Sequence, residues 1–434
     1  MASPSPGASS SPRAAGPGAG TAIEPGRVDR TSLALDATYD ATLALDDATG
    51  TVRVGATITL RNTSGGPIDR VELNTVAAPL GRIRLGDTTV DGRSVRPSVD
   101  DQTIVVPLGG ILPAGATARL ELAYRATLRS GTGGSDWLFS RANGVVALYR
   151  WLPWVSRRTA FERANFGDPF VTPISPSVRV TVTTARPLVV ATSGRRVDVS
   201  PDRRRQTFEA ANVRDFVITA SAAYRRTIGR AGDTRIEVYT LPGGPAAELL
   251  AAARRSLERI EALLGPYPYP AFVVAQTGGG FGMEAPGLIW IPRTVERARI
   301  PYLVAHETAH QWFYALVGND QAREPFADEA AADFVARTIL GLRRASRCPE
   351  QRLDLSIYRY SAGCYYEVVY IQGGNFLDDL RRRIGSTAFW RALREYVADN
   401  RFGLARTRTL LDALDDATRL DLTPRYAPRF PSLY

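Results

Sequence analysis

Apolar and polar residues alternate along much of the first half of the chain, between about residues 30 and 225. Every second residue is apolar in the runs Val52–Leu60, Leu120–Tyr124 and Val178–Val182. A period of two is typical of a strand that buries one face. Segments rich in turn-forming residues separate these runs, as at 62–66 and 113–115. We therefore predict a twisted antiparallel β-sandwich, or saddle, domain over residues 29–228.

The pattern changes near residue 242 to apolar residues spaced by three or four, at Leu250, Ala253, Leu257, Ile260 and Leu264. This spacing predicts a helix, which Gly265 can end. Short strands are expected at 272–275 and 288–291, on either side of a glycine-rich loop. From Pro301 to about residue 416 the chain is predicted to be mostly helical, with one helix from Tyr302 to Val317. Residues 229–434 thus form a predicted α+β domain.

The first 26 residues are almost entirely Ala, Ser, Pro and Gly. Such a segment buries too little apolar surface to offset its ordering entropy, so residues 1–28 are expected to be a disordered linker. The sequence shows no signal peptide and no run of ~20 apolar residues that would span a bilayer. A spacer of this kind favours an exported protein, peripheral or lipid-anchored at the cell surface after removal of a signal; a cytoplasmic protein is the alternative.

The charge and the cysteines add two expectations. The net charge is +10, every basic residue is arginine, and the basic clusters lack interleaved aromatic residues, so nucleic-acid binding is not expected. Cys348 and Cys364 are the only cysteines, and in an exported protein they would form one disulfide across a short loop. Two buried free thiols are the alternative.

The strongest chemical signal is the segment His306-Glu307-Thr308-Ala309-His310. Residues four apart lie on one face of a helix, so both imidazoles can reach one metal ion. Glu307 can then reach a water molecule at the metal without ligating it. The chain has only these two histidines, which makes two ordinary core histidines at this spacing an improbable coincidence.

A catalytic zinc ion with two histidine ligands needs a third protein ligand. A second predicted helix opens at Glu324-Pro325 and can pack antiparallel to the first. On chemistry alone its Glu324, Asp328 and Glu329 are all candidates. We therefore expect one Zn²⁺ per chain, in a site with His₂ and one carboxylate, which is a hydrolytic arrangement.

These residues resemble the M1 family of zinc aminopeptidases, whose catalytic domain is thermolysin-like. The family has HExxH, eighteen further residues and a ligating glutamate, and this spacing selects Glu329. Its Gly-x-Met-Glu-Asn signature is similar to the segment 281–285, which implies that Gly282, Met283 and Glu284 bind substrate and that Glu284 holds the free α-amine. The resemblance also implies that Tyr370, in Tyr370-Ile371-Gln372-Gly373, stabilises the oxyanion, with Tyr365 and Tyr366 as rivals.

The chain departs from the family pattern in three places. Phe281 and Ala285 replace the Gly and Asn of the second signature, no N-terminal-domain Gln or Glu matches the family's second amine ligand, and the large C-terminal helical domain has no counterpart. The resemblance nevertheless implies a zinc aminopeptidase that acts on peptides with a free N-terminus, with Glu307 as general base. An endopeptidase or another zinc hydrolase is the alternative enzyme, and an inactive peptidase-like binding module is the alternative of another class.

Overall fold

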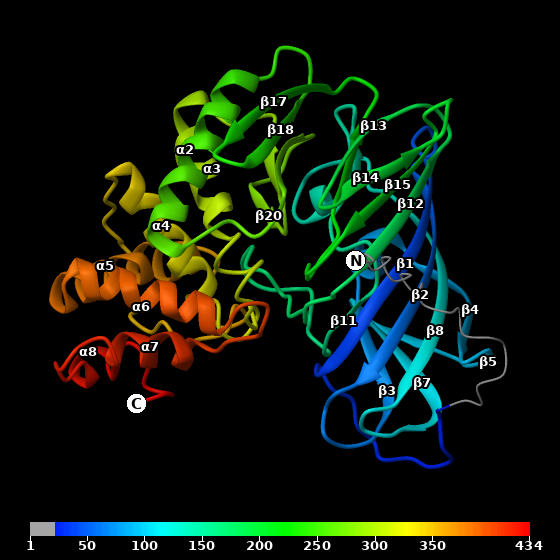
Figure 1. Ribbon diagram of the computed structural model, residues 1–434, viewed down its shortest axis with the longest axis horizontal. Coiled ribbons are helices and arrows are strands. Elements are labelled where there is room, and N and C mark those ends of the chain that lie inside the picture. The colour runs from blue at the N-terminus through cyan, green and yellow to red at the C-terminus, as the bar shows by residue number, and fades with distance from the viewer. Residues whose placement is uncertain (1–21) are drawn as a thin grey trace, which may run out of the picture.

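A computed structural model describes residues 22–434, which form a β-rich half followed by a mostly helical half (Figure 1). In Figure 1 the blue and cyan part of the chain forms sheets on one side of the molecule, and the yellow to red part forms helices on the other. The predicted order of a β-sandwich and then an α+β domain is therefore confirmed.

The largest layer of the β half is an eight-stranded sheet with the order β14-β15-β12-β1-β2-β8-β4-β5. Its strands are β1 (Leu35–Asp46), β2 (Thr51–Asn62), β4 (Arg84–Val90), β5 (Arg93–Ser94), β8 (Thr117–Thr127), β12 (Val178–Thr184), β14 (Arg195–Val199) and β15 (Arg205–Ala210). Buried and accessible residues alternate along β1 and β2, as the period of two predicts. β1 and β12 pair in parallel, so the sheet is mixed rather than purely antiparallel.

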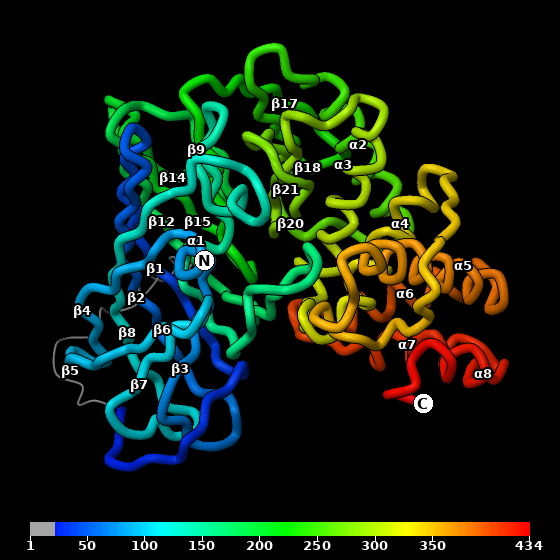
Figure 2. The backbone as a smooth tube through the Cα atoms, turned by 180° about the vertical axis from the view of Figure 1, so that it is seen from behind, coloured from blue at the N-terminus to red at the C-terminus, as the bar shows by residue number. Residues whose placement is uncertain are grey.

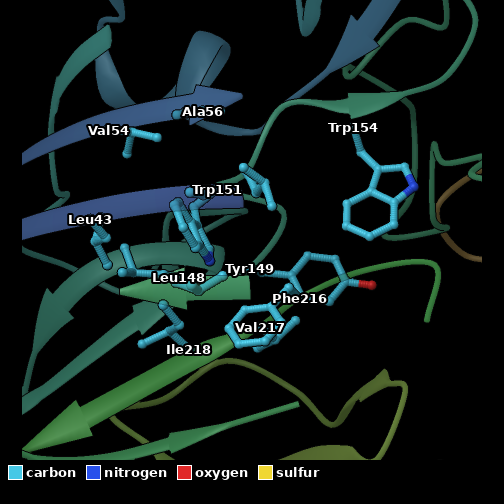
Figure 3. Packing of buried hydrophobic residues seen from close by; sticks show 14 of the residues in the cluster. Leu43, Val54, Ala56, Leu148, Tyr149, Trp151, Trp154, Phe216, Val217 and Ile218 are labelled. Carbon is cyan, nitrogen blue, oxygen red and sulfur yellow. The ribbon is translucent and has the colours of Figure 1, made fainter. Parts of the chain in front are cut away.

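Two four-stranded sheets, β13-β16-β10-β9 and β11-β3-β7-β6, complete the β half. Their elements, with two short helical turns, are β3 (Ile68–Asn74), α1 (Ala77–Gly81), β6 (Ser98–Asp100), β7 (Thr103–Leu112), η1 (Asp136–Leu138), β9 (Phe139–Ala142), β10 (Val145–Leu148), β11 (Trp154–Val155), β13 (Val189–Thr192) and β16 (Ile218–Ser221). Figure 3 shows Leu43 and Val54 of the large sheet close to Leu148, Trp151 and Ile218, which belong to one buried cluster. The sheets therefore share an apolar core.

A five-stranded sheet, β17-β18-β19-β21-β20, opens the second half. Its strands are β17 (Arg225–Ala231), β18 (Thr234–Thr240), β19 (Ala271–Thr277), β20 (Met283–Ala285) and β21 (Leu288–Pro292). β18, β19 and β21 run parallel, whereas β17 and β20 are antiparallel edge strands. The predicted apolar helix is α2 (Ala246–Leu264), which ends at Gly265 and crosses between β18 and β19. β17 starts at Arg225, slightly before the predicted boundary at residue 229.

The remaining elements are helical and share an apolar core with α2 and the five-stranded sheet. They are η2 (Arg297–Arg299), α3 (Ile300–Ala309), η3 (Phe326–Ala330), α4 (Ala331–Leu340), η4 (Tyr366–Gln372), α5 (Gly373–Ile384), α6 (Ser386–Asp399), α7 (Thr407–Asp415) and α8 (Thr423–Tyr426). From behind, Figure 2 shows α5 to α8 on the side away from the β half, with the C-terminus beside α7 and α8. Within residues 22–434, none of the helices has the length and apolar character needed to cross a membrane.

The first helix of the predicted zinc motif is shorter than the sequence suggests. α3 ends at Ala309, whereas we predicted helix as far as Val317. Beyond it, the amides of Ala315 and Leu316 bond to carbonyl groups five residues earlier, which widens the turn. The buried guanidinium of Arg214, from the β half, donates to the carbonyl oxygens of Ala315 and Leu316, each at 3.3 Å. Tertiary contacts therefore override a good local helix propensity.

The segment between α4 and η4, residues 341–364, is irregular where we expected further helix. Cys348 and Cys364 form a disulfide across it, with Cα atoms 5.6 Å apart, so the predicted pairing is confirmed. Glu367 accepts hydrogen bonds from the amides of Arg347 and Cys348, at 2.6 and 2.8 Å. These contacts satisfy backbone groups that a helix would otherwise pair.

The predicted N-terminal linker lies mostly outside the described residues. Its last part is packed: Ile23 is buried, and Glu24 forms a two-way backbone bridge with Ile111 of β7. The packed chain therefore begins before residue 29, because the side chain of Ile23 contributes to the apolar core.

Candidate metal centre and catalytic cleft

Three side chains, from α3, from the residue that follows it and from η3, converge on one point. Nε2 of His306 lies 3.3 Å from Nε2 of His310, and Oε2 of Glu329 lies 3.3 and 3.4 Å from these two nitrogens. All three residues are buried. The one-face spacing of the histidines and the wider turn of η3 thus bring together the residues that the sequence proposed as metal ligands.

The triangle of donor atoms fits a zinc ion. Tetrahedral ligands about 2.0–2.2 Å from zinc lie roughly 3.3–3.5 Å from one another. Among residues 22–434, Oε2 of Glu329 is a buried oxygen atom without a hydrogen-bond donor, which is costly unless a cation takes that place. Two imidazoles and one carboxylate also match the donor set of hydrolytic zinc sites.

Asp328 supports the site without joining the triangle. Its Oδ1 lies 2.7 Å from Nδ1 of His310, so this nitrogen carries the proton and Nε2 is left free to bind a metal. The amide of Gln321 donates to Oδ2 of Asp328 at 2.7 Å and to Oε1 of Glu284 at 2.9 Å. Of the three carboxylates that chemistry alone left open, Asp328 therefore orients a ligand. Glu324 instead accepts the amide of Thr407.

Glu307 lies on α3 beside the triangle and faces the loop before β20. It is 4% exposed and lines the same cavity as the two histidines. A Cβ atom at Gly282 would lie only 2.1 Å from Oε1 of Glu307, so this carboxylate is packed directly against the glycine. Gly282 therefore provides the space that Glu307 occupies, and β20 places Met283 and Glu284 next to it.

Tyr370 stands against the metal triangle from the opposite helix. Its ring stacks on His306 with centroids 5.4 Å apart. Burial, with the negative charge of Glu329, raises the pKa of Tyr370 well above its usual value, so the phenol stays a donor. Its two rivals both pack against Tyr370, with ring centroids 5.8 Å away for Tyr365 and 4.8 Å away for Tyr366. Tyr365 is buried, whereas Tyr366 is exposed and its hydroxyl also lies 3.4 Å from that of Tyr302.

Asp168 is a cleft residue that the sequence analysis missed. It lies on an irregular segment of the β half and lines the cavity, although it is buried. Asn165 pins this segment to the helical half by donating to the carbonyl oxygens of Ile357 and Tyr360 at 2.7 and 3.1 Å. No periodic pattern marks Asp168, and its position depends wholly on this contact between the two halves.

The cleft carries a surplus of negative charge. Its buried carboxylates belong to Asp168, Glu284, Glu307, Asp328 and Glu329. Burial raises the pKa values of Glu284 and Glu307 to about 8 each. The charge of His310 acts to lower both pKa values, and the neighbouring carboxylates act to raise them. Burial and the charge of Glu284 also raise the pKa of Asp168 well above its usual value. Such a site favours the binding of cations.

The same fold occurs in solved structures of M1 zinc metallopeptidases. One from Deinococcus radiodurans is 22% identical, with a TM-score of 0.69 over 88% of this chain and 90% of that chain. A variant with one glutamate replaced by alanine is 20% identical, with a TM-score of 0.71 over 94% of this chain and 96% of that chain. The variant bound to a Tyr-Ser-Ala substrate is 21% identical, with a TM-score of 0.69 over 94% and 96%. No family model matches the chain. The likeness shows the fold.

Proposed function

We propose that this protein is a zinc-dependent aminopeptidase that removes N-terminal residues from peptides. One observation carries the proposal: the buried triangle of His306, His310 and Glu329 lies beside Glu284. Gln321 connects the two, because its amide donates to both Glu284 and Asp328. A zinc site alone fits many hydrolases. A fixed carboxylate next to it favours a substrate that has an ammonium group close to the reacting carbonyl.

His306, His310 and Glu329 would hold the metal. A zinc ion bound there supplies Lewis acidity, which polarises a carbonyl and makes water a better nucleophile. Glu307 accepts the proton of the attacking water on the cavity side of α3, and then passes it to the leaving amine. Its burial suits this role, because a base with a raised pKa both takes up and releases a proton near neutral pH.

Tyr370, Glu284 and Asp168 complete the arrangement. The protonated phenol of Tyr370 donates a hydrogen bond to the oxyanion as the carbonyl is attacked, which contributes roughly a hundredfold or more in rate. Glu284 and Asp168 line the same cavity and together bind the α-ammonium group, so Asp168 takes the place of the family's second amine ligand, for which the sequence offered no match. Both carboxylates are buried, so an N-blocked peptide would leave them without a cation.

The edge strand β20 offers a way to bind the peptide backbone. It pairs with β21 on one side only, so a peptide can add along its free edge near Gly282 and Met283. The variant of the Deinococcus radiodurans enzyme bound to a Tyr-Ser-Ala substrate supports a peptide as the substrate here. Related structures of a two-domain M1 zinc metallopeptidase variant are bound to L-arginine and to L-tryptophan.

Hydrolysis of aminoacyl fluorogenic substrates, beside their N-acetylated counterparts and with or without a zinc chelator, tests the proposal. We expect chelator-sensitive cleavage of the free-amine set alone. Cleavage of the acetylated set would make the protein an endopeptidase and remove the role given to Glu284. No cleavage by zinc-loaded protein would favour another hydrolase or an inactive peptidase-like binding module.

We also propose that the protein works outside the cytoplasm, as a secreted or lipid-anchored protein. The disulfide between Cys348 and Cys364 supports this location, because such bonds persist in oxidising compartments. Thiol trapping of protein taken directly from its native cells, with separation of the cell envelope and the medium, tests the proposal. Reduced thiols or a cytoplasmic location would contradict it.

A further inference from the structure

The cavity that contains the metal ligands extends past His306 to the guanidinium of Arg344. Its volume is about 770 Å³, and Tyr302, Arg344 and Tyr366 line it on this side. Arg344 belongs to the irregular segment 341–364 that the disulfide closes. The far end of the cleft is therefore built by a segment with no regular structure of its own.

Arg344 is held by three contacts. Its guanidinium lies 4.6 Å from the ring centroid of Tyr302 and donates to the hydroxyl of Tyr366. The side-chain amide of Asn375 donates to its backbone carbonyl at 3.0 Å. Tyr302 is itself fixed, since its hydroxyl bonds to the buried carboxylate of Asp333. The guanidinium is thus placed on an aromatic surface and keeps donors available.

The charge of Arg344 is not matched by a carboxylate. Over the described part of the chain, its guanidinium forms no ion pair within 4.0 Å, unlike that of Arg343, which pairs with Asp378 at 2.9 Å. At the rim of the same cavity, Arg299 pairs with Glu296 at 3.4 Å. Arg163 also lines the cavity without an ion pair among the described residues, but its guanidinium donates to the backbone carbonyl oxygens of Phe161 and Gly167. Arg344 is therefore a cation of the cleft whose guanidinium is held by aromatic side chains.

Arg344 and Glu284 are connected to different histidines of the metal triangle. Contacts run from Arg344 to Tyr302 at 4.6 Å, and from Tyr302 to His306 at 6.0 Å between ring centroids. Glu284 is linked instead to the His310 side, through Gln321 and Asp328. Glu284, the triangle and Arg344 line one cavity, so a peptide with its ammonium group at Glu284 and its first carbonyl at the triangle can extend its C-terminal part past His306 to Arg344.

The distance selects short peptides. The distances from Arg344 to Tyr302 and from Tyr302 to His306 together set an upper limit of about 11 Å between the guanidinium and the His306 ring. One extended residue spans about 3.3–3.6 Å, so two residues beyond the cleaved bond plus an ion pair of ~3 Å reach about 10 Å. The C-terminal carboxylate of a dipeptide or tripeptide is therefore within reach of the guanidinium, and a longer peptide would place uncharged backbone there.

We propose that Arg344 binds the C-terminal carboxylate of short peptides and gives this enzyme a preference for short peptides with a free carboxyl group. The proposal rests on the aminopeptidase function proposed above and names its substrate class. Arginine suits this role, because its planar group binds a carboxylate through two parallel hydrogen bonds.

The test compares one tripeptide as free acid and as C-terminal amide. We expect the wild-type kcat/KM to be about 10- to 100-fold higher for the free acid. Arg344→Gln should abolish the distinction between the two, and Arg344→Lys should restore part of it. Arg343→Gln is the matched control, because that neighbour pairs with Asp378 outside the cleft, and it should keep the wild-type ratio.

A binding measurement makes the result independent of turnover. Calorimetry on the zinc-loaded Glu307→Gln variant should show tighter binding of the free acid than of the amide, and adding Arg344→Gln should remove the difference. If protein that retains Arg344 has equal kcat/KM and equal affinity for the free-acid and the amidated tripeptide, the proposal for Arg344 is wrong. The aminopeptidase function would still hold in that case, provided that only peptides with a free N-terminus are cleaved. If N-blocked peptides are cleaved equally well, the proposed function itself fails.

Discussion

Nδ1 of His310 lies 2.7 Å from Oδ1 of Asp328, and the residue that follows Asp328 supplies the third proposed metal ligand. One turn of η3 thus delivers both the carboxylate that orients an imidazole and the carboxylate that completes the triangle. The wider turn of a π-helix suits this double task, because it changes the angle between successive side chains.

Asp328→Asn should weaken zinc binding about 10- to 100-fold, because an amide holds the His310 proton and ring orientation less firmly than a carboxylate. Competition with a chromogenic chelator measures the affinity. Asp320→Asn is a suitable control, since that carboxylate pairs with Arg157 away from the triangle. Unchanged zinc affinity in the Asp328 variant would show that its contact with His310 is not important for the metal.

Glu307→Gln should retain zinc and lower kcat by at least two to four orders of magnitude, because the amide cannot accept the proton of the attacking water. Metal analysis and single-turnover kinetics on the same preparation check both parts. A zinc-loaded variant with nearly normal turnover would require another base.

Gly282→Ala tests the close packing between the glycine and the proposed base. The added Cβ would lie 2.1 Å from Oε1 of Glu307, so the carboxylate has to move away from its place in the cavity. A displacement of about 1 Å costs roughly 100-fold in rate, and we expect that loss in kcat with zinc content unchanged. Gly133→Ala is the matched control, because a Cβ there meets no atom within 4 Å.

Asp168→Asn should raise KM for free-amine substrates about tenfold and reduce discrimination against N-acetylated ones, because one of the two buried carboxyl groups proposed to bind the ammonium is removed. Initial rates on the paired substrates measure both effects. Glu162→Gln is the control, since Glu162 lies on the same segment but is exposed. A drop in kcat alone, with full discrimination, would assign Asp168 to another step.

The parts of the site that could be predicted are those encoded by local spacing. His306 and His310 are four residues apart, so the sequence alone indicates their common face, and Glu307 directly follows His306. The choice of Glu329 over Asp328 needed the family spacing, because both carboxylates sit together on η3. Asp168 and Arg344 could not be found in this way, because each lies on an irregular segment that only long-range contacts place in the cleft.

The fold shows the same division. The alternation of apolar and polar residues predicted β1 and β2, and the apolar stripe predicted α2. In these elements the periodicity of the sequence itself sets which residues are buried. The end of α3 was predicted wrongly, because Arg214 arrives from the β half and takes the carbonyl groups of Ala315 and Leu316. The parallel pairing of β1 with β12 was also missed, since strand direction across a long connection leaves no local pattern.

The disulfide provides the last prediction, because it closes the segment that carries Arg344. Replacing Cys348 and Cys364 by serine should lower the free energy of unfolding by about 3 kcal/mol, as expected for a loop of some 15 residues. It should also narrow the kcat/KM ratio between free-acid and amidated tripeptides, because the segment behind Arg344 would be less ordered. Chemical denaturation and the paired tripeptide assay measure the two effects.

Reduction of the wild-type protein under native conditions should reproduce both effects. The zinc content should stay unchanged, because η3 and α3 lie outside the closed loop. Loss of zinc would mean that the segment supports the whole site, and an unchanged ratio with lowered stability would mean that Arg344 is held by Tyr302 and Tyr366 alone.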